Sequence, residues 1–207
     1  NRSLGWDLLP PGSPSYEFED LDKKTKQKKT FVYAGYGQTP DRWEKGTEPE
    51  PIGWKAGVQY DGDVARAKDV LNNLEEYYPG AQGYEVAGFF WWQGDKDRYN
   101  AGHAAKYEQN LANLFRALRR DFNAPEARMV VATLGQTDKD AASGNEKLII
   151  DGMFALSKNP EFEGDVATVY THPLSMGGAS NGHYGGNAKT YMNAGLAMGE
   201  AMVEMIK

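Results

Sequence analysis

The sequence predicts an α/β protein, a three-layer α/β/α sandwich built on a parallel sheet. Two observations lead to this prediction. Apolar segments of strand length alternate along the chain with longer segments that have helical periodicity. Each apolar segment also ends in polar or turn-forming residues. Because strand–helix–strand connections are right-handed, this alternation produces parallel strands that are covered by helices on both faces.

Three segments are predicted to form the strands of this sheet. Tyr84–Trp92 is a run of mostly hydrophobic residues, which is typical of a strand buried on both faces. Arg128–Leu134 and Asp165–Thr171 are the second and third strands. Because parallel strands end at the same edge of a sheet, the polar loops that follow these segments are expected to converge there.

Four segments carry apolar residues at helical spacing. The first is Val58–Leu74, and the pair Pro79-Gly80 stops it. The other three predicted helices are His103–Phe122, Asn145–Leu156 and Ala188–Ile206.

The first 55 residues are expected to be irregular, because prolines recur in them and break any long element. Within this region Thr30–Tyr36 is predicted to be a short strand or extended segment. The basic run Lys23–Lys29 is interpreted as a solvated loop rather than as a partner site or processing signal.

Composition excludes several classes of protein. The 207 residues are 40% hydrophobic, which is enough for a real core, and their net charge of −6 argues against a nucleic-acid partner. No window approaches the roughly 18 apolar residues of a membrane span. Cysteine is absent, so disulfides and thiolate metal sites make no contribution. The chain starts at Asn1 without an initiator Met or a signal peptide, and a processed or truncated product is therefore expected.

Polar residues gather at two places beyond the predicted strands. Gln93, Gly94 and Asp95 directly follow the first strand. The second cluster, Ser180–Tyr184, contains His183 and stands just before the last predicted helix. An amide, an acid and a histidine on separate loops at one sheet edge indicate a hydrolytic site. No Gly-rich phosphate loop follows a predicted strand, which argues against a nucleotide binder.

These blocks resemble a known family. Tyr84–Asp97 resembles the W-x-Q-G-E block of the sialate O-acetylesterase-like domain, a branch of the SGNH hydrolases related to acetyl xylan esterases of carbohydrate esterase family six. Asn1–Leu4 is similar to the end of that family's Gly-Gly-x-Ser-Leu block, and His183, followed by a helix, resembles its final D-x-x-H block. The resemblance implies a flavodoxin-like sheet and a single domain over residues 1–207 that is incomplete at its N-terminus.

The resemblance also identifies a missing part. Members of the family carry their nucleophilic serine in a G-Q-S-N block upstream of the glycine pair, and this chain begins after that point. Gly37–Thr39 and Gly135–Thr137 both read Gly-Gln-Thr, but neither follows the first strand of the fold. The first strand and the serine are therefore expected on an N-terminal segment that is either a separate chain left by proteolysis of the same precursor or simply missing from this sequence.

The family's chemistry assigns roles to the remaining residues. His183 is the expected general base. The family's acid three residues before it is Ser180 here, so either Asp95 or a backbone carbonyl is expected to orient the imidazole. The Gln93 amide and the Gly94 N–H are expected to stabilise the oxyanion. Structural interpretations stand beside these roles: Gln93 as an amide that fixes its loop, Asp95 as a helix cap and His183 as a helix-entry residue. Residues expected to line the substrate cleft are Arg2, Trp6, Gln136 and His172, the last of which is also the rival base.

The resemblance implies a carbohydrate esterase that removes O-acetyl or similar acyl groups from sugars or polysaccharides by a serine–histidine mechanism, without a cofactor or metal. Its expected partners are an acetylated carbohydrate and the separate segment that carries the serine, and its expected location is secreted or periplasmic. The alternative is a catalytically degenerate domain that acts as a glycan-binding or structural module, which the missing triad acid favours.

Overall fold

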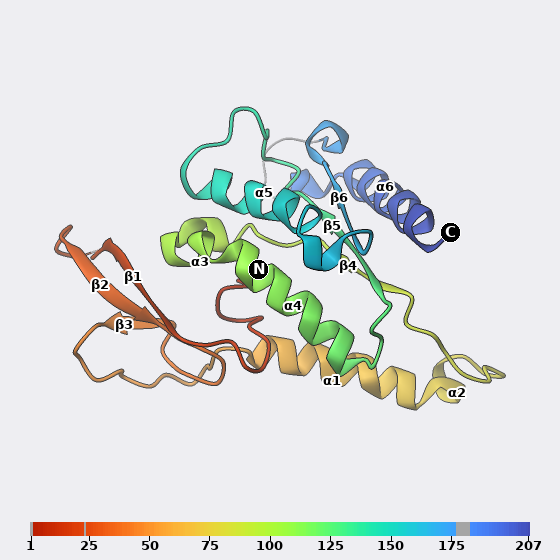
Figure 1. Cartoon of the computed structure of the whole chain (residues 1–207), viewed down its shortest axis with the longest axis horizontal. Helices are drawn as coiled ribbons and strands as arrows, with labels where there is room; N and C mark the ends of the chain where they lie inside the picture. The colour runs from red at the N-terminus through yellow and green to blue at the C-terminus, as the bar shows by residue number, and fades with distance from the viewer. Residues whose placement is uncertain (1, 23, 177–182) are drawn as a thin grey trace.

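A parallel three-stranded sheet lies at the centre of the computed structural model, which describes residues 2–22, 24–176 and 183–207 (Figure 1). Its strands are β4 (Gly88–Trp91), β5 (Arg128–Ala132) and β6 (Val166–Val169), in that order. Both β4–β5 and β5–β6 pair in parallel, so the predicted parallel arrangement is confirmed.

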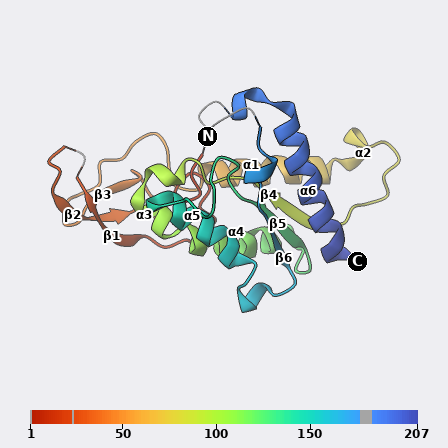
Figure 2. The same cartoon turned by 90° about the horizontal axis from the view of Figure 1, so that it is seen from above.

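Helices cover both faces of this sheet. Met129 and Val131 of β5 face the cluster formed with α4, whereas Val130 and Ala132 face Met198 and Met202 of α6. Figure 2 shows α4 and α6 on opposite sides of the strands. The bounds of the helices are α1 (Val58–Asn72), α2 (Leu74–Tyr77), α3 (Ala101–Ala105), α4 (Tyr107–Asp121), α5 (Gly144–Leu156) and α6 (Ala188–Ile206). Single 3₁₀ turns occur at Asp97–Tyr99, Pro160–Phe162 and His172–Leu174, and Tyr184–Gly186 forms a turn with positive φ angles.

The predicted helix His103–Phe122 is two helices in the structure. Asn100 caps α3 by accepting hydrogen bonds from the backbone N–H groups of Gly102 and His103. Lys106, with φ −105° and ψ 4°, then leaves helical geometry and separates α3 from α4. The helical periodicity of the sequence continues across this break, because both helices bury apolar residues against the same core.

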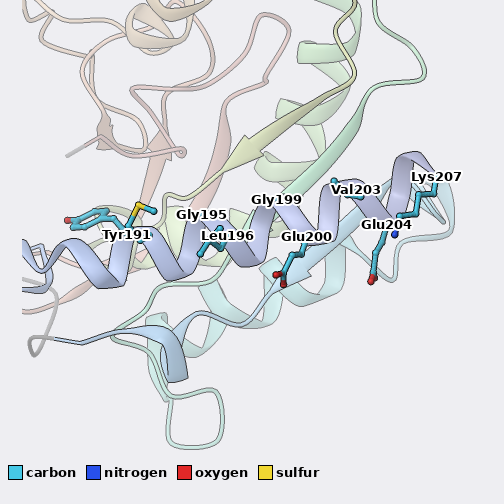
Figure 3. Close-up of a pocket in the computed structure, with 9 residues that line it drawn as sticks. Tyr191, Gly195, Leu196, Gly199, Glu200, Val203, Glu204 and Lys207 are labelled. Carbon is cyan, nitrogen blue, oxygen red and sulfur yellow. The ribbon is translucent and has the colours of Figure 1, made fainter.

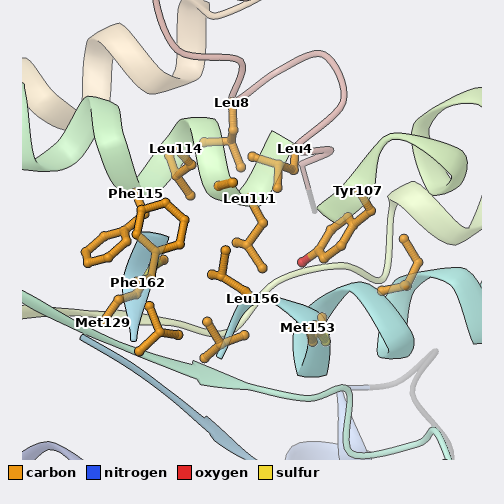
Figure 4. Packing of buried hydrophobic residues seen from close by; sticks show 14 of the residues in the cluster. Leu4, Leu8, Tyr107, Leu111, Leu114, Phe115, Met129, Met153, Leu156 and Phe162 are labelled. Carbon is orange, nitrogen blue, oxygen red and sulfur yellow. The ribbon is translucent and has the colours of Figure 1, made fainter. Parts of the chain in front are cut away.

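The larger core cluster joins α4 and α5 to the sheet, and the N-terminal loop closes it. Leu111, Leu114 and Phe115 of α4 are fully or almost fully buried. Leu4 and Leu8, from the irregular N-terminal segment, pack onto the same cluster (Figure 4). Residues 2–8 are therefore fixed to the main body, close to the carboxyl end of β4.

A second sheet, which is antiparallel, projects from one end of the molecule. It contains β1 (Tyr16–Leu21), β2 (Lys28–Tyr33) and β3 (Arg42–Glu44), in that order. The extended segment predicted at Thr30–Tyr36 overlaps β2, but β1 and β3 were not predicted. The interpretation of the whole basic run as a loop is also wrong, because Lys28 and Lys29 pair with Leu21 and Asp20 of β1.

The strand predicted at Tyr84–Trp92 is shorter than expected and only partly buried. Tyr84 precedes β4 and is 54% exposed, and Phe90 within it is 55% exposed. The reason is that β4 is the outer strand of the sheet over the described residues, with β5 on one side only. Among the described residues, no helix is long and apolar enough to cross a membrane.

Candidate active site

A cavity of about 270 Å³ lies where the loops after β4 and β5 meet the start of α6. It is therefore at the carboxyl edge of the parallel sheet, where open α/β sheets bind ligands. The residues that line it come from four separate stretches of the chain: Arg2, Trp92, Gln93, Gly94, Asp95, Leu134, Gln136, His183, Tyr184 and Tyr191.

Most of the residues expected in the site line this cavity, and two do not. Trp6 packs instead against the small cluster of Leu9, Ala34 and Ala56. His172 places its Nδ1 atom 2.9 Å from the carbonyl oxygen of Gly135 and stacks on Tyr170, outside the cavity lining. Ser180, the residue at the family's acid position, lies outside the described residues.

Gln93 holds its loop to the N-terminal segment. Its side-chain nitrogen donates to the carbonyl oxygen of Arg2, at 2.7 Å, and to Oδ2 of Asp97, at 2.6 Å. A primary amide has two hydrogens, so both are engaged in this structure. The Tyr107 hydroxyl donates to the backbone oxygen of Gln93 at 2.6 Å. This is the geometry of an amide that fixes its loop.

Asp97 is the buried anchor of the same network. Its side chain accepts hydrogen bonds from the backbone N–H of Leu4 (2.9 Å) and of Gly5 (2.7 Å), in addition to the Gln93 amide. The residue has no exposed surface. Burial raises the pKa of the Asp97 carboxyl, while the nearby His103 imidazole and these hydrogen bonds oppose the rise. Three N–H donors aimed at one carboxyl group favour its ionised form.

Gly94 occupies a position that only glycine fits. Its φ of 147° is unfavourable for residues with a side chain, and a Cβ atom there would lie 2.8 Å from Cε of Met153. The close approach brings the backbone between Gln93 and Asp95 down onto α5. The peptide group of Gly94 thereby forms part of the cavity wall.

Asp95 and Arg2 carry the charges along the cavity. Oδ1 of Asp95 accepts from Nε of Arg98 at 2.8 Å and from Nε2 of Gln136 at 3.3 Å. The Arg2 guanidinium stacks over the Trp54 ring, 4.5 Å from its centroid. Arg2 also pairs with Asp7 at 3.5 Å, so its side chain is held at the cavity from two sides.

Three aromatic rings form the opposite wall. Trp92 stacks on Tyr184, with ring centroids 5.7 Å apart and planes inclined by 18°. Tyr191 contacts both of them, at 5.6 Å from Trp92 and 6.0 Å from Tyr184. Tyr184 is almost fully buried, whereas Tyr191 is 42% exposed. The wall thus offers an exposed tyrosine ring next to His183, which is also exposed.

Sequence reasoning missed four residues of this site. Asp97 follows Gln93 by four positions, and its burial is invisible in a polar loop sequence. Trp92 was predicted only as part of a strand, Tyr184 only as a neighbour of His183, and Tyr191 only as part of the last predicted helix, Ala188–Ile206. The one available signal was the adjacency of a tyrosine to the expected base.

Comparison with known proteins identifies the class. A family model described as a carbohydrate esterase, sialic acid-specific acetylesterase, matches residues 15–204, so the chain belongs to this family. The predicted family resemblance is confirmed. No curated protein matches the sequence. Among solved structures, the X-ray structure of a protein from Arabidopsis thaliana matches at 16% identity and a TM-score of 0.43, over 95% of this chain and 85% of that one.

The Asp97 network predicts a stability defect for an isosteric change. In Asp97→Asn an NH₂ group replaces one oxygen and faces N–H donors, so the variant is expected to lose about 1–3 kcal/mol of unfolding free energy. Urea denaturation measures this. Asp140→Asn is the matched control, because the Asp140 side chain is 79% exposed, and its stability is expected to match that of the parent. Equal stability of the Asp97→Asn variant and the parent would contradict this account of the carboxylate.

Proposed function

We propose that this protein is a carbohydrate O-acetylesterase that removes acetyl or similar acyl groups from sugars. The observation that carries the proposal is one cavity, at the carboxyl edge of the sheet, that His183 shares with the Gln93–Asp95 loop. Membership of a carbohydrate esterase family supplies the reaction class. The exposed ring of Tyr191 beside the cavity fits a sugar face, since aromatic rings pack well against apolar C–H surfaces.

His183 is the proposed general base. It takes the proton of a serine hydroxyl as the serine oxygen bonds to the acyl carbon, and it returns that proton to the sugar oxygen as the ester C–O bond breaks. Water then repeats the sequence on the acyl-enzyme, which releases the carboxylic acid and frees the serine. Each step needs an imidazole that reaches both the serine and the leaving oxygen, which an exposed position on the cavity allows.

Asp95 is the proposed partner of His183, with a backbone carbonyl as the alternative. Asp95 lines the same cavity, and its contacts with Arg98 and Gln136 fix the carboxylate there. The variant Asp95→Asn separates the two proposals. A large loss of turnover would make Asp95 the acid of the triad, while near-normal turnover would leave a dyad that the backbone supports.

The backbone N–H of Gly94 is the proposed oxyanion donor. The Gln93 amide, expected in this role from the sequence, already donates to Arg2 and Asp97. To donate to an oxyanion, the Gln93 amide would have to give up its hydrogen bond to the Arg2 carbonyl oxygen. Gln93 is therefore proposed to act mainly by holding Gly94 in place, and removal of an oxyanion-hole donor typically costs about 10²–10³ in turnover.

The serine is proposed to come from a strand that pairs with the edge of β4 that has no partner strand among the described residues. β4 ends two residues before Gln93, and Phe90 within the strand is exposed. Unpaired strand edges favour pairing with another segment.

The outward side of α6 is also apolar. A groove runs along it, and its lining side chains are drawn in Figure 3. Its exposed side chains are Tyr191, Met192, Leu196 and Val203.

A glycan-binding module is the second candidate function. The aromatic wall of Trp92, Tyr184 and Tyr191 favours it, as does the engagement of both Gln93 amide hydrogens. A module of this kind would bind an acetylated sugar in the same cavity without hydrolysing it.

The esterase proposal predicts a loss of catalysis on removal of the base. The native protein, meaning this chain with any polypeptide that co-purifies with it, is expected to hydrolyse acetylated sugars. His183→Ala should lower its turnover by about 10²–10⁴-fold, the usual contribution of general acid–base catalysis. His172→Ala is the matched control and should remain near the parent value.

Two outcomes would contradict the assignment. Equal turnover of the His183→Ala variant and the parent would remove His183 from the mechanism, and a large loss in the His172→Ala variant would move the base there. If the native protein binds acetylated sugars but hydrolyses none, the binding module is the correct function.

The proposed origin of the serine predicts a second polypeptide. Intact-mass analysis of the native protein, after reaction with a fluorophosphonate, is expected to find the label on a segment other than residues 1–207. A label on a serine within residues 1–207, or full activity from this chain alone as a folded monomer, would contradict the proposal.

A further inference from the structure

The turn that presents His183 has an unfavourable backbone. His183 has φ 47° and ψ 56°, and Tyr184 has φ 56°, so two residues with side chains adopt the left-handed region in succession. Gly185 and Gly186 continue it with φ 62° and 69°. For residues other than glycine such a backbone is strained, and it persists only where surrounding contacts hold it.

Tyr184 holds the turn from inside the cavity wall. Its hydroxyl accepts a hydrogen bond from the backbone N–H of Gly135 at 3.0 Å and donates one to Oε1 of Gln136 at 3.0 Å. Burial raises the pKa of Tyr184, which keeps the hydroxyl protonated and able to donate. A Cβ atom on Gly135 would lie only 2.9 Å from the Tyr184 ring, so glycine there permits the close approach.

Tyr191 holds the turn from the helix. Its hydroxyl donates to the carbonyl oxygen of His183 at 3.0 Å. The preceding residue, Thr190, is fully buried and bonds through its hydroxyl to both the N–H and the C=O of Met176, at 2.7 and 2.9 Å. Adjacent residues of α6 therefore fix the chain on both sides of residues 177–182.

We infer that Tyr184 and Tyr191 are positioning residues for His183, and we call the pair the tyrosine clamp. The clamp fixes the left-handed turn against the loop after β5 and so directs the imidazole into the cavity. Neither hydroxyl contacts the reacting atoms in this assignment, because each is occupied by backbone or Gln136. The consequence for catalysis rests on the proposed esterase function, whereas the effect on the backbone of His183 does not.

Tyrosine-to-phenylalanine variants remove the clamp while keeping the rings. In the native protein, Tyr191→Phe and Tyr184→Phe are each expected to lower kcat about two- to tenfold, the equivalent of one hydrogen bond, with little change in KM. In a His183→Ala background the same changes should have no further effect, because the clamp acts only through His183. Tyr78→Phe, at a side chain that is 63% exposed, is the control.

A second measurement is independent of activity. The Cα and Cβ chemical shifts of His183 and Tyr184 in the isolated chain report left-handed backbone in the parent. In Tyr191→Phe and Tyr184→Phe the His183 shifts are expected to move toward unstrained values, while Tyr78→Phe leaves them in place.

The outcomes separate the clamp from the proposed function. Unchanged His183 shifts in both variants would overturn the clamp, and so would an equal loss of kcat in the parent and His183→Ala backgrounds, which indicates a structural or substrate-binding role. If the shifts move but the native protein hydrolyses no ester, the clamp stands and the esterase proposal fails.

Discussion

The site depends on one buried carboxylate. Asp97 receives the N–H groups of Leu4 and Gly5, residues that precede it by more than ninety positions, together with the amide of Gln93. Burial of a carboxylate without exposed surface costs free energy unless hydrogen-bond donors surround it, so the loss of any of the three donors destabilises the site. Through them the N-terminal loop and the loop after β4 become one rigid wall, which places Arg2, Gly94 and Asp95 around a common cavity.

Each of the other loops has a comparable anchor. Tyr184 joins the turn at His183 to the loop after β5, and Thr190 fixes Met176 to the start of α6. The anchoring side chains are buried, whereas His183 and the ring of Tyr191, which would contact a substrate, are exposed. A site built in this way keeps its reactive groups accessible to substrate without leaving their backbone free to move.

Periodicity predicted the elements whose burial follows a repeating pattern. The parallel strands and α5 and α6 were predicted because apolar residues recur at fixed spacing, and the convergence of their loops followed from the parallel direction. The break at Lys106 was missed because the apolar stripe continues across it. β1 was missed although its aromatics and glutamates alternate as in a half-buried strand, because the prolines around it led to the expectation of an irregular region. The roles of Gln93 and Asp97 depend on bonds to residues 2–5, and no local pattern predicts partners at such separation.

An acetylated sugar is expected to bind in this cavity rather than in the apolar groove of α6. An NMR titration of the isolated chain with an O-acetylated monosaccharide tests it most directly, since binding does not require the serine. We expect saturable shifts at His183, Gln136 and the indole N–H of Trp92, with little change at Met192, Leu196 and Val203 on the outward face of α6. Shifts confined to Leu196 and Val203, or none at any concentration, would contradict it.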